Sequence, residues 1–292
     1  MYHYKILKSL FTKTLLKKNL TLKNSTDKNE LYIIGNGSSL KYYDMSLFID
    51  KPSITCGYFF INNNFKNLNI LAHTEIDPFI LYPYHKNKFY NKYQKNLIRE
   101  VYTKYFPMHE LPLVTSLTNL IAFKNLKNIF FTHHFGTKNN IFNIKQCDLS
   151  SSMMFMSGSV YFMIAFAYYL GFKKIYLVGM DYLNTIPENG HFYTFGKGRK
   201  FKHSSQKIEY DLRFFYFFKH YLDINVITRK GFNSNYGLNN YLYEDLFGVK
   251  EKYNENNIIS SHEGLSLLNT HAKQHPGKAD DGDDYVSKIY PD

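Results

Sequence analysis

The chain has 292 residues, of which 44% are hydrophobic, enough for one large domain with a buried core. Its 36 basic and 24 acidic side chains give a formal charge of +12, which favours anionic partners such as nucleic acid, anionic lipid or acidic sugars. Cys56 and Cys147 are the only cysteines, which excludes a disulfide framework and a cysteine-rich zinc cluster and predicts a cytoplasmic setting.

The N-terminal segment 1–28 is basic and carries apolar side chains at helical spacing between lysines. No small-residue cleavage site follows it, so we predict no secretory signal. The pattern suits an amphipathic helix that lies on an anionic membrane. A helix packed on the surface of the domain explains it equally well.

Residues 29–181 alternate apolar runs with helical patterns, which predicts an α/β core. The first strand is expected within 31–40 and runs into a glycine-rich turn. Further strands are expected at 53–60, 68–73, 128–134, 173–181 and 224–228, and helices at 86–106, 157–171 and 207–222. This order predicts a single Rossmann-like domain, with a parallel sheet that binds ligands beyond the carboxyl ends of its strands.

The stretch 150–172 contains no charged residue and is long enough to cross a bilayer. It begins with three serines and leads directly into the apolar run at 173–181. We therefore interpret it as a buried helix of the core.

Three further segments complete the predicted organisation. Residues 182–206 lack periodicity and form a long loop, which we interpret as a lid subdomain over the site. Residues 207–262 are the C-terminal part of the core, and 263–292 form a polar tail.

The turn after the first strand is the first candidate site. It contains Gly35, Asn36, Gly37, Ser38 and Ser39. Glycines let a ligand approach the backbone, and free N–H groups at a helix start favour a phosphate. The spacing matches neither the dinucleotide fingerprint nor a P-loop. The alternative is an ordinary strand–helix turn with serine capping.

Two other groups of residues carry suitable chemistry. Ser157, Gly158 and Ser159 precede the buried helix, where hydroxyl and N–H groups can hold a carboxylate or phosphate or simply cap the helix. Tyr193 and His203 lie in the long loop. A histidine suits general-base catalysis near neutral pH, and a tyrosine hydroxyl can stabilise a departing phosphate, although loop histidines are commonly just solvated.

No metal site is expected. His133 and His134 lack further ligands at suitable spacing, and Asp181 stands alone at the end of a predicted strand rather than in an acidic pair. We predict a reaction without a metal cofactor.

Three segments together resemble the bacterial lipooligosaccharide sialyltransferases of glycosyltransferase family 42. They are YIIGNGSSLKYYD at 32–44, SGSVYFMIAFAYYLGFKKIYLVGMDYL at 157–183, and HFYTFG with KHSSQKIEYDLRFF between 191 and 215. They occur in the family's order at compatible spacing and make up about a fifth of the chain. The resemblance implies a GT-A-like variant of the Rossmann-like fold and metal-independent transfer of sialic acid from CMP-sialic acid with inversion.

The resemblance also implies roles for individual residues. The nucleotide would be bound by the turn residues Gly35, Asn36, Gly37 and Ser38, with Gly57, the Ser157–Ser159 segment, Asp181 and Tyr182. Tyr193 would support the leaving phosphate, and His203 would take the proton of the acceptor hydroxyl.

The chain departs from the family pattern at several of these positions. Gly57 stands where the family has an asparagine, unless Asn62 or Asn63 takes its place, and Leu183 stands where it has a second tyrosine, with Tyr182 adjacent. Another CMP-linked nonulosonic acid or CMP-Kdo therefore stays open as the donor, as does a different nucleotide sugar. The segment 157–183 also resembles motility accessory proteins implicated in flagellin glycosylation.

We expect a peripheral enzyme at the cytoplasmic face of the inner membrane, acting on lipopolysaccharide or another glycan. The anionic membrane surface is an expected partner and nucleic acid is not. The sequence leaves homo-oligomerisation open. A basic nucleic-acid-binding α/β protein and a noncatalytic glycan-binding or assembly factor remain the alternatives from other classes.

Overall fold

A computed structural model describes most of the chain. The described residues are 12–77, 80–81, 92–107, 110–123, 125–135, 142–154, 156, 158–183, 191–193, 205–234, 236–254 and 258. His203, Ser157 and the polar tail 263–292 lie outside these ranges, as does most of the predicted lid.

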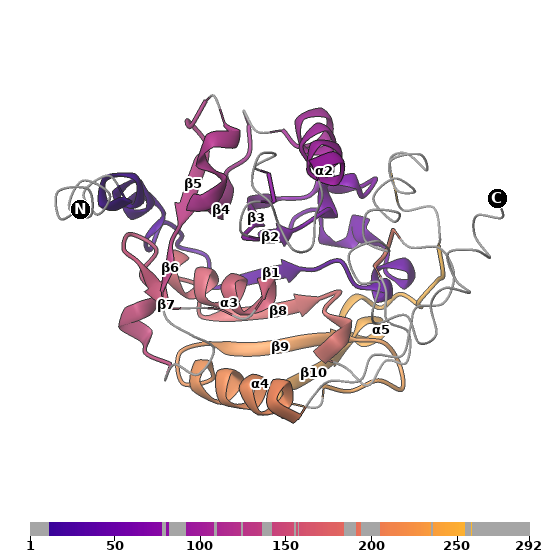
Figure 1. The fold of residues 1–292 in the computed structure, drawn as a ribbon. Helices are drawn as coiled ribbons and strands as arrows, with labels where there is room; N and C mark the ends of the chain where they lie inside the picture. Colours follow the sequence, from indigo (N-terminus) through magenta and orange to yellow (C-terminus); the bar gives the residue numbers. More distant parts are fainter. Residues whose placement is uncertain are drawn as a thin grey trace.

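The centre of the fold is an all-parallel sheet of eight strands in the order β10-β9-β8-β1-β2-β3-β4-β5 (Figure 1). In that order the strands are Asn239–Leu242, Asp223–Thr228, Lys174–Val178, Glu30–Ile34, Ser53–Cys56, Ile70–Glu75, Leu113–Ser116 and Ile129–Thr132. A small parallel pair, β6 (His134–Phe135) and β7 (Met153–Met154), lies apart from this sheet. The predicted α/β class and Rossmann-like parallel sheet are confirmed.

Alternate residues along the central strands pack into two hydrophobic cores. Leu31 and Ile33 of β1 contribute to one core, whereas Tyr32 and Ile34 contribute to the other. This follows from the two-residue repeat of a strand. Because both faces are covered, the central strands β1 and β8 are buried and apolar on both faces after their first residue.

Both faces are covered by α-helices together with 3-10 helices. The first core contains α3 (Ser159–Leu170) and α4 (Ser205–Phe218). The second contains α2 (Lys92–Tyr105), α5 (Tyr243–Phe247) and 3-10 helices. The 3-10 helices of the chain are η1 to η8: Lys18–Leu22, Ser38–Tyr42, Met45–Phe48, Phe59–Ile61, Phe65–Asn67, Leu117–Ala122, Ile144–Cys147 and Asp181–Leu183.

The buried helix predicted within the uncharged stretch is confirmed at Ser159–Leu170, whereas Met153 and Met154 near the start of the stretch form β7. Apart from Tyr168, α3 is buried from Val160 to Leu170. The helix ends at Gly171, whose left-handed φ of 103° allows the amide of Phe172 to donate to the carbonyl of Ala167 at 3.2 Å. Within the described residues, no helix combines the length and apolarity needed to cross a membrane.

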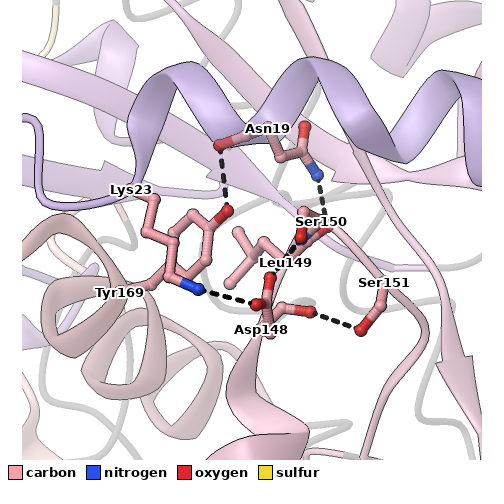
Figure 2. Close-up of polar contacts among 7 residues, drawn as sticks. All are labelled: Asn19, Lys23, Asp148, Leu149, Ser150, Ser151 and Tyr169. Carbon is pink, nitrogen blue, oxygen red and sulfur yellow. Dashed lines mark hydrogen bonds and ion pairs between the residues drawn. The ribbon is translucent and has the colours of Figure 1, made fainter.

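The described part of the N-terminal segment packs on the domain beside β5. Figure 2 shows Asn19 between helix α3 and the segment around Leu149. The side-chain amide of Asn19 donates to the carbonyls of Phe131 (2.7 Å) and Leu149 (2.6 Å), while the Tyr169 hydroxyl donates to the Asn19 carbonyl at 3.0 Å. Residues 12–22 therefore follow the surface-packing interpretation; 1–11 lie outside the described ranges.

Candidate functional site

The chain reverses its direction across the sheet between β1 and β8. From β1 it proceeds through β2, β3, β4 and β5 on one side, and it returns to β8 on the other side of β1. The carboxyl ends of β1 and β8 lead into the turns that begin at Gly35 and Gly179. Parallel sheets bind ligands at such a switch point, so these turns define the candidate site.

The glycines allow the two turns to pack against each other. The amide of Gly35 donates to the carbonyl of Val178, and the amide of Gly37 donates to that of Gly179, both at 2.8 Å. A Cβ atom on Gly35 would lie 2.7 Å from the Gly179 oxygen, and one on Gly37 would lie 2.5 Å from Cγ of Asp181. The space beside both glycines is thus filled by the β8 turn.

Asp181 fixes the β1 turn from the β8 side. Its carboxylate accepts hydrogen bonds from the amide of Ser39 (2.8 Å), the hydroxyl of Ser38 (3.0 Å) and the hydroxyl of Ser39. Burial raises the pKa of Asp181 above its ordinary value, while these hydrogen bonds and the charge of Arg229 oppose the rise. The helix expected after this turn is a short 3-10 helix, η2.

Asn36 lies between Gly35 and Gly37 but faces the opposite neighbour, β2. Its side-chain nitrogen donates to the carbonyl of Cys56 at 3.0 Å. Its side-chain oxygen is buried and has no hydrogen-bond partner among the described residues. Gly57, with φ of 56°, approaches so closely that a Cβ atom there would lie 2.7 Å from the Asn36 amide nitrogen.

Residues 191–193 of the predicted lid pack against the β1 turn. His191 forms an antiparallel bridge with Gly37, and the amide of Phe192 donates to the Asn36 carbonyl at 2.9 Å. The ring of Tyr193 is only 2% exposed and stacks on His191 with a centroid distance of 4.8 Å. It also meets Tyr58 edge-on at 5.9 Å.

The structure therefore brings together most of the predicted site. Gly35, Asn36, Gly37, Ser38, Gly57, Asp181 and Tyr193 converge at the switch point. Gly158 and Ser159 begin α3, which precedes β8 with a short connection, so they lie toward the same carboxyl edge. The side chain of Tyr182 lies outside the described ranges, and so do Ser157 and His203. The binding and catalytic roles of all the predicted site residues stay predictions.

Sequence analysis missed a buried polar cluster behind Gly57. The Gly57 carbonyl lies 2.9 Å from Nε2 of His73 on β3 and 2.9 Å from the hydroxyl of Tyr102 on α2. The Tyr102 hydroxyl also lies 2.8 Å from Oε2 of Glu75. The available signal was the polar end of β3, where His73, Thr74 and Glu75 follow an apolar start.

A cavity lies apart from this edge of the sheet. It has a volume of about 960 Å³ and is lined by Arg99, Tyr102, Phe106 and Lys127, among others, next to the amino ends of β4 and β5. Within the described ranges, no three His, Cys, Asp or Glu side chains gather closely enough to hold a metal ion. The predicted metal independence is not tested by this arrangement.

Comparison with known proteins yields similarity in structure alone. No protein-family model matches the sequence, and a search of curated proteins finds no match. The MAf glycosyltransferase from Magnetospirillum magneticum AMB-1 is similar, with a TM-score of 0.47 and 11% identity. The aligned region covers 90% of this chain but 42% of that one, so the chain spans less than half of its length.

Two sialyltransferases from Campylobacter jejuni are also similar. CstII in complex with CMP-3FNeuAc gives a TM-score of 0.39 at 18% identity, covering 83% of this chain and 100% of that one. The α-2,3-sialyltransferase in apo form gives 0.37 at 18%, covering 85% and 95%. TM-scores below 0.5 do not establish an activity.

Proposed function

We propose that the chain is an inverting glycosyltransferase that transfers sialic acid, or a related nonulosonic acid or Kdo, from a CMP-linked donor to a cell-surface glycan. The observation that carries the proposal is the buried side-chain oxygen of Asn36. It lies at the switch point without a hydrogen-bond partner among the described residues. The ordered sequence motifs around positions 36, 158, 193 and 203 support the same assignment.

An unpaired buried amide oxygen indicates a missing donor. Leaving such an acceptor unsatisfied costs about 1–3 kcal/mol, so buried acceptors are nearly always paired. The exocyclic amino group of cytosine and the hydroxyls of ribose are donors of the right kind. The bond from Asn36 to the Cys56 carbonyl holds the side chain with its oxygen free for such a group.

The reaction needs little beyond binding, a base and support for the leaving group. We assign His203 as the base that removes the acceptor hydroxyl proton while the acceptor oxygen attacks the anomeric carbon. The bond from that carbon to the phosphate oxygen breaks, and CMP departs with the bonding electrons. Tyr193 would then donate to the departing phosphate; because its ring is 2% exposed, this role requires segment 191–193 to shift.

We also propose that the enzyme works at the cytoplasmic face of the inner membrane on a lipid-linked or lipopolysaccharide acceptor. The formal charge of +12 supports attraction to an anionic surface. Binding to vesicles that contain anionic lipid, lost at high salt, is the expected result. Equal binding to neutral vesicles would contradict it.

The donor assignment is tested by nucleotide binding. CMP is expected to raise the melting temperature, whereas UDP and GDP leave it unchanged and EDTA has no effect on the CMP shift. Asn36→Ala should weaken CMP binding about tenfold or more, since it removes the free acceptor. Asn67→Ala, at an exposed asparagine, is the matched control. Absence of a CMP shift, or equal CMP affinity in both variants, would remove the proposal.

The base assignment is tested separately. His203→Ala should leave CMP binding intact and lower transfer by about 10²–10⁴-fold. His220→Ala, at an exposed histidine of the described chain, should transfer at the wild-type rate. Normal turnover in His203→Ala would show that another group accepts the proton.

A further inference from the structure

In the cluster behind Gly57, the Tyr102 hydroxyl has one proton but lies within hydrogen-bonding distance of two acceptor oxygens. The Tyr102 oxygen lies 2.9 Å from the Gly57 carbonyl and 2.8 Å from Oε2 of Glu75. A carbonyl only accepts, and an ionised carboxylate only accepts. With a single proton, Tyr102 can donate to one of these two oxygens, so the other contact needs a proton from elsewhere.

His73 does not supply the proton that the second contact of the Tyr102 oxygen lacks. Its Nδ1 lies 2.7 Å from the Thr55 hydroxyl, and its Nε2 lies 2.9 Å from the Gly57 carbonyl. A neutral ring that carries its proton on Nε2 accepts from Thr55 and donates to Gly57, which satisfies both nitrogens. Its 3.4 Å separation from the Tyr102 oxygen is longer than either of these contacts.

We propose that Glu75 is protonated in the folded protein at neutral pH and donates to Tyr102, whose hydroxyl then donates to the Gly57 carbonyl. This chain of hydrogen bonds makes Glu75 and Tyr102 positioning residues for the turn on which Asn36 rests. The oxygen of Glu75 that keeps no proton accepts from the amide of Asp77 at 3.3 Å. Every polar contact of the carboxyl group is then satisfied.

The surroundings of Glu75 favour the neutral form. The side chain is buried, and the charged group that faces it from its own segment is the acidic Asp77. Tyr102 faces it from α2 and Cys56 from β2, and neither carries a positive charge. Burial, reinforced by Asp77, raises the pKa of Glu75 to about 8. Within the described residues, no Lys or Arg forms an ion pair with it.

The link to the nucleotide site runs through Gly57. Its positive φ and its close approach to the Asn36 amide place the Cys56–Gly57 peptide directly against that side chain. When Glu75 loses its proton, Tyr102 donates to the carboxylate and Gly57 keeps His73 alone as donor. The inference on nucleotide binding rests on the proposed function, whereas the inference on protonation does not.

The first test uses the protein without nucleotide. Because the folded state holds the Glu75 proton above the unfolded pKa, stability falls as pH rises toward about 8. Between pH 6.5 and 8 the unfolding equilibrium constant of the wild type should rise by up to about tenfold per pH unit relative to Glu75→Gln. Glu100→Gln, at an exposed residue of α2, should retain the wild-type slope. Equal slopes in wild type and Glu75→Gln would overturn the protonation.

A second readout serves if Glu75→Gln does not fold. Infrared difference spectra of the unliganded wild type should show a protonated-carboxyl carbonyl band at pH 7 that is lost on raising the pH through about 8. Absence of such a band at pH 7 would overturn the proposal.

The last test separates the positioning role from the proposed function. CMP affinity of the wild type should fall about tenfold as pH rises through about 8, while that of Glu75→Gln stays level. If the stability test succeeds and CMP fails to bind at any pH, the proposed function fails and the protonation stands. If CMP binds with the same pH profile in both proteins, the positioning role is wrong.

Discussion

The β1 turn is held differently by its two neighbours. Toward β8, the contacts are saturated: Asp181 accepts three hydrogen bonds, and the turn backbones pair at 2.8 Å. Toward β2, hydrogen-bonding capacity remains, since the Asn36 oxygen has no partner among the described residues. Behind that side lies the protonatable cluster of Glu75 and Tyr102.

This contrast separates the residues that hold the turn in place from Asn36, to which we assign nucleotide recognition. Gly35, Gly37 and Ser38 bring the turns together and leave no room or free hydroxyl beside them. Asn36, in their midst, points the other way. A glycine-rich turn at a switch point can therefore owe its glycines to packing against the neighbouring turn. In the proposed function, Asn36 is the side chain of this turn that binds the ligand.

The largest loss of stability is expected for a substitution of Asp181, at the centre of the saturated side. Asp181→Ala leaves the amide and hydroxyl of Ser39 and the hydroxyl of Ser38 without their buried acceptor. We expect a loss of about 3 kcal/mol in the free energy of unfolding, measured by denaturant titration. Glu209→Ala, on the exposed face of α4, should change it by less than about 0.5 kcal/mol. A small loss for Asp181→Ala would contradict its scaffold role.

A Cβ atom introduced into the packed turn should lower the free energy of unfolding by somewhat less than Asp181→Ala does. Gly37→Ala would place that atom 2.5 Å from Cγ of Asp181, although its φ of −63° suits any residue. We expect a loss of about 2 kcal/mol from overpacking. Gly248→Ala is the comparison, because its φ of 68° is unfavourable but nothing lies within 4 Å. Equal CMP affinity in the folded Gly37→Ala and Gly248→Ala variants would sharpen the contrast between the β8 side and the β2 side of the turn.

Acid should destabilise the folded protein on the β2 side of the turn by protonating His73. Burial lowers the pKa of His73 to about 3, so the folded state takes up a proton later than the unfolded state, whose value lies near 6.5. Stability should therefore be lost as pH falls from about 6.5 to about 3, by up to about 1.4 kcal/mol per pH unit. Between about 4.5 and 6.5 the opposite slope of Glu75 masks this loss, so it is best measured below pH 4.5. His73→Gln should flatten the curve there; an unchanged slope would contradict the assignment.

The smallest change is a serine hydroxyl on the saturated side. Ser38→Ala removes one of three bonds to Asp181 and should cost about 1 kcal/mol of stability. Its CMP affinity should stay within about threefold of the wild type, in contrast to Asn36→Ala. Comparable losses of affinity in the two variants would erase the distinction between the sides of the turn.

Sequence patterns located six strands of the eight-stranded sheet, among them the four-residue strands β2 and β5. The run at 173–181 contains β8, and the uncharged stretch contains α3. Two strands of the eight-stranded sheet escaped: β4 follows Pro112 and ends in Thr115 and Ser116, while β10 is largely exposed and rich in asparagine. Both depend on pairing with distant neighbours, which local periodicity does not record.

The candidate site was predictable as a set of turns but not as a set of contacts. The position of Asn36 after the first strand followed from the topology of parallel sheets. The roles of Ser38 and Asp181 as partners did not, because 143 positions separate them in the chain. The Glu75–Tyr102 contact joins a strand to a helix in the same unpredictable way.

The contacts of the N-terminal segment with β5 have a consequence for self-association. β5 is the last strand of the sheet, and Asn19 occupies the carbonyl of Phe131 on it, while Lys18 donates to that of Ile129 at 3.0 Å. Removing residues 1–24 would leave these carbonyls open to strand addition by another molecule. A protein shortened in this way should aggregate from its β5 border, whereas an N-terminal fusion that leaves 12–24 intact should remain dispersed.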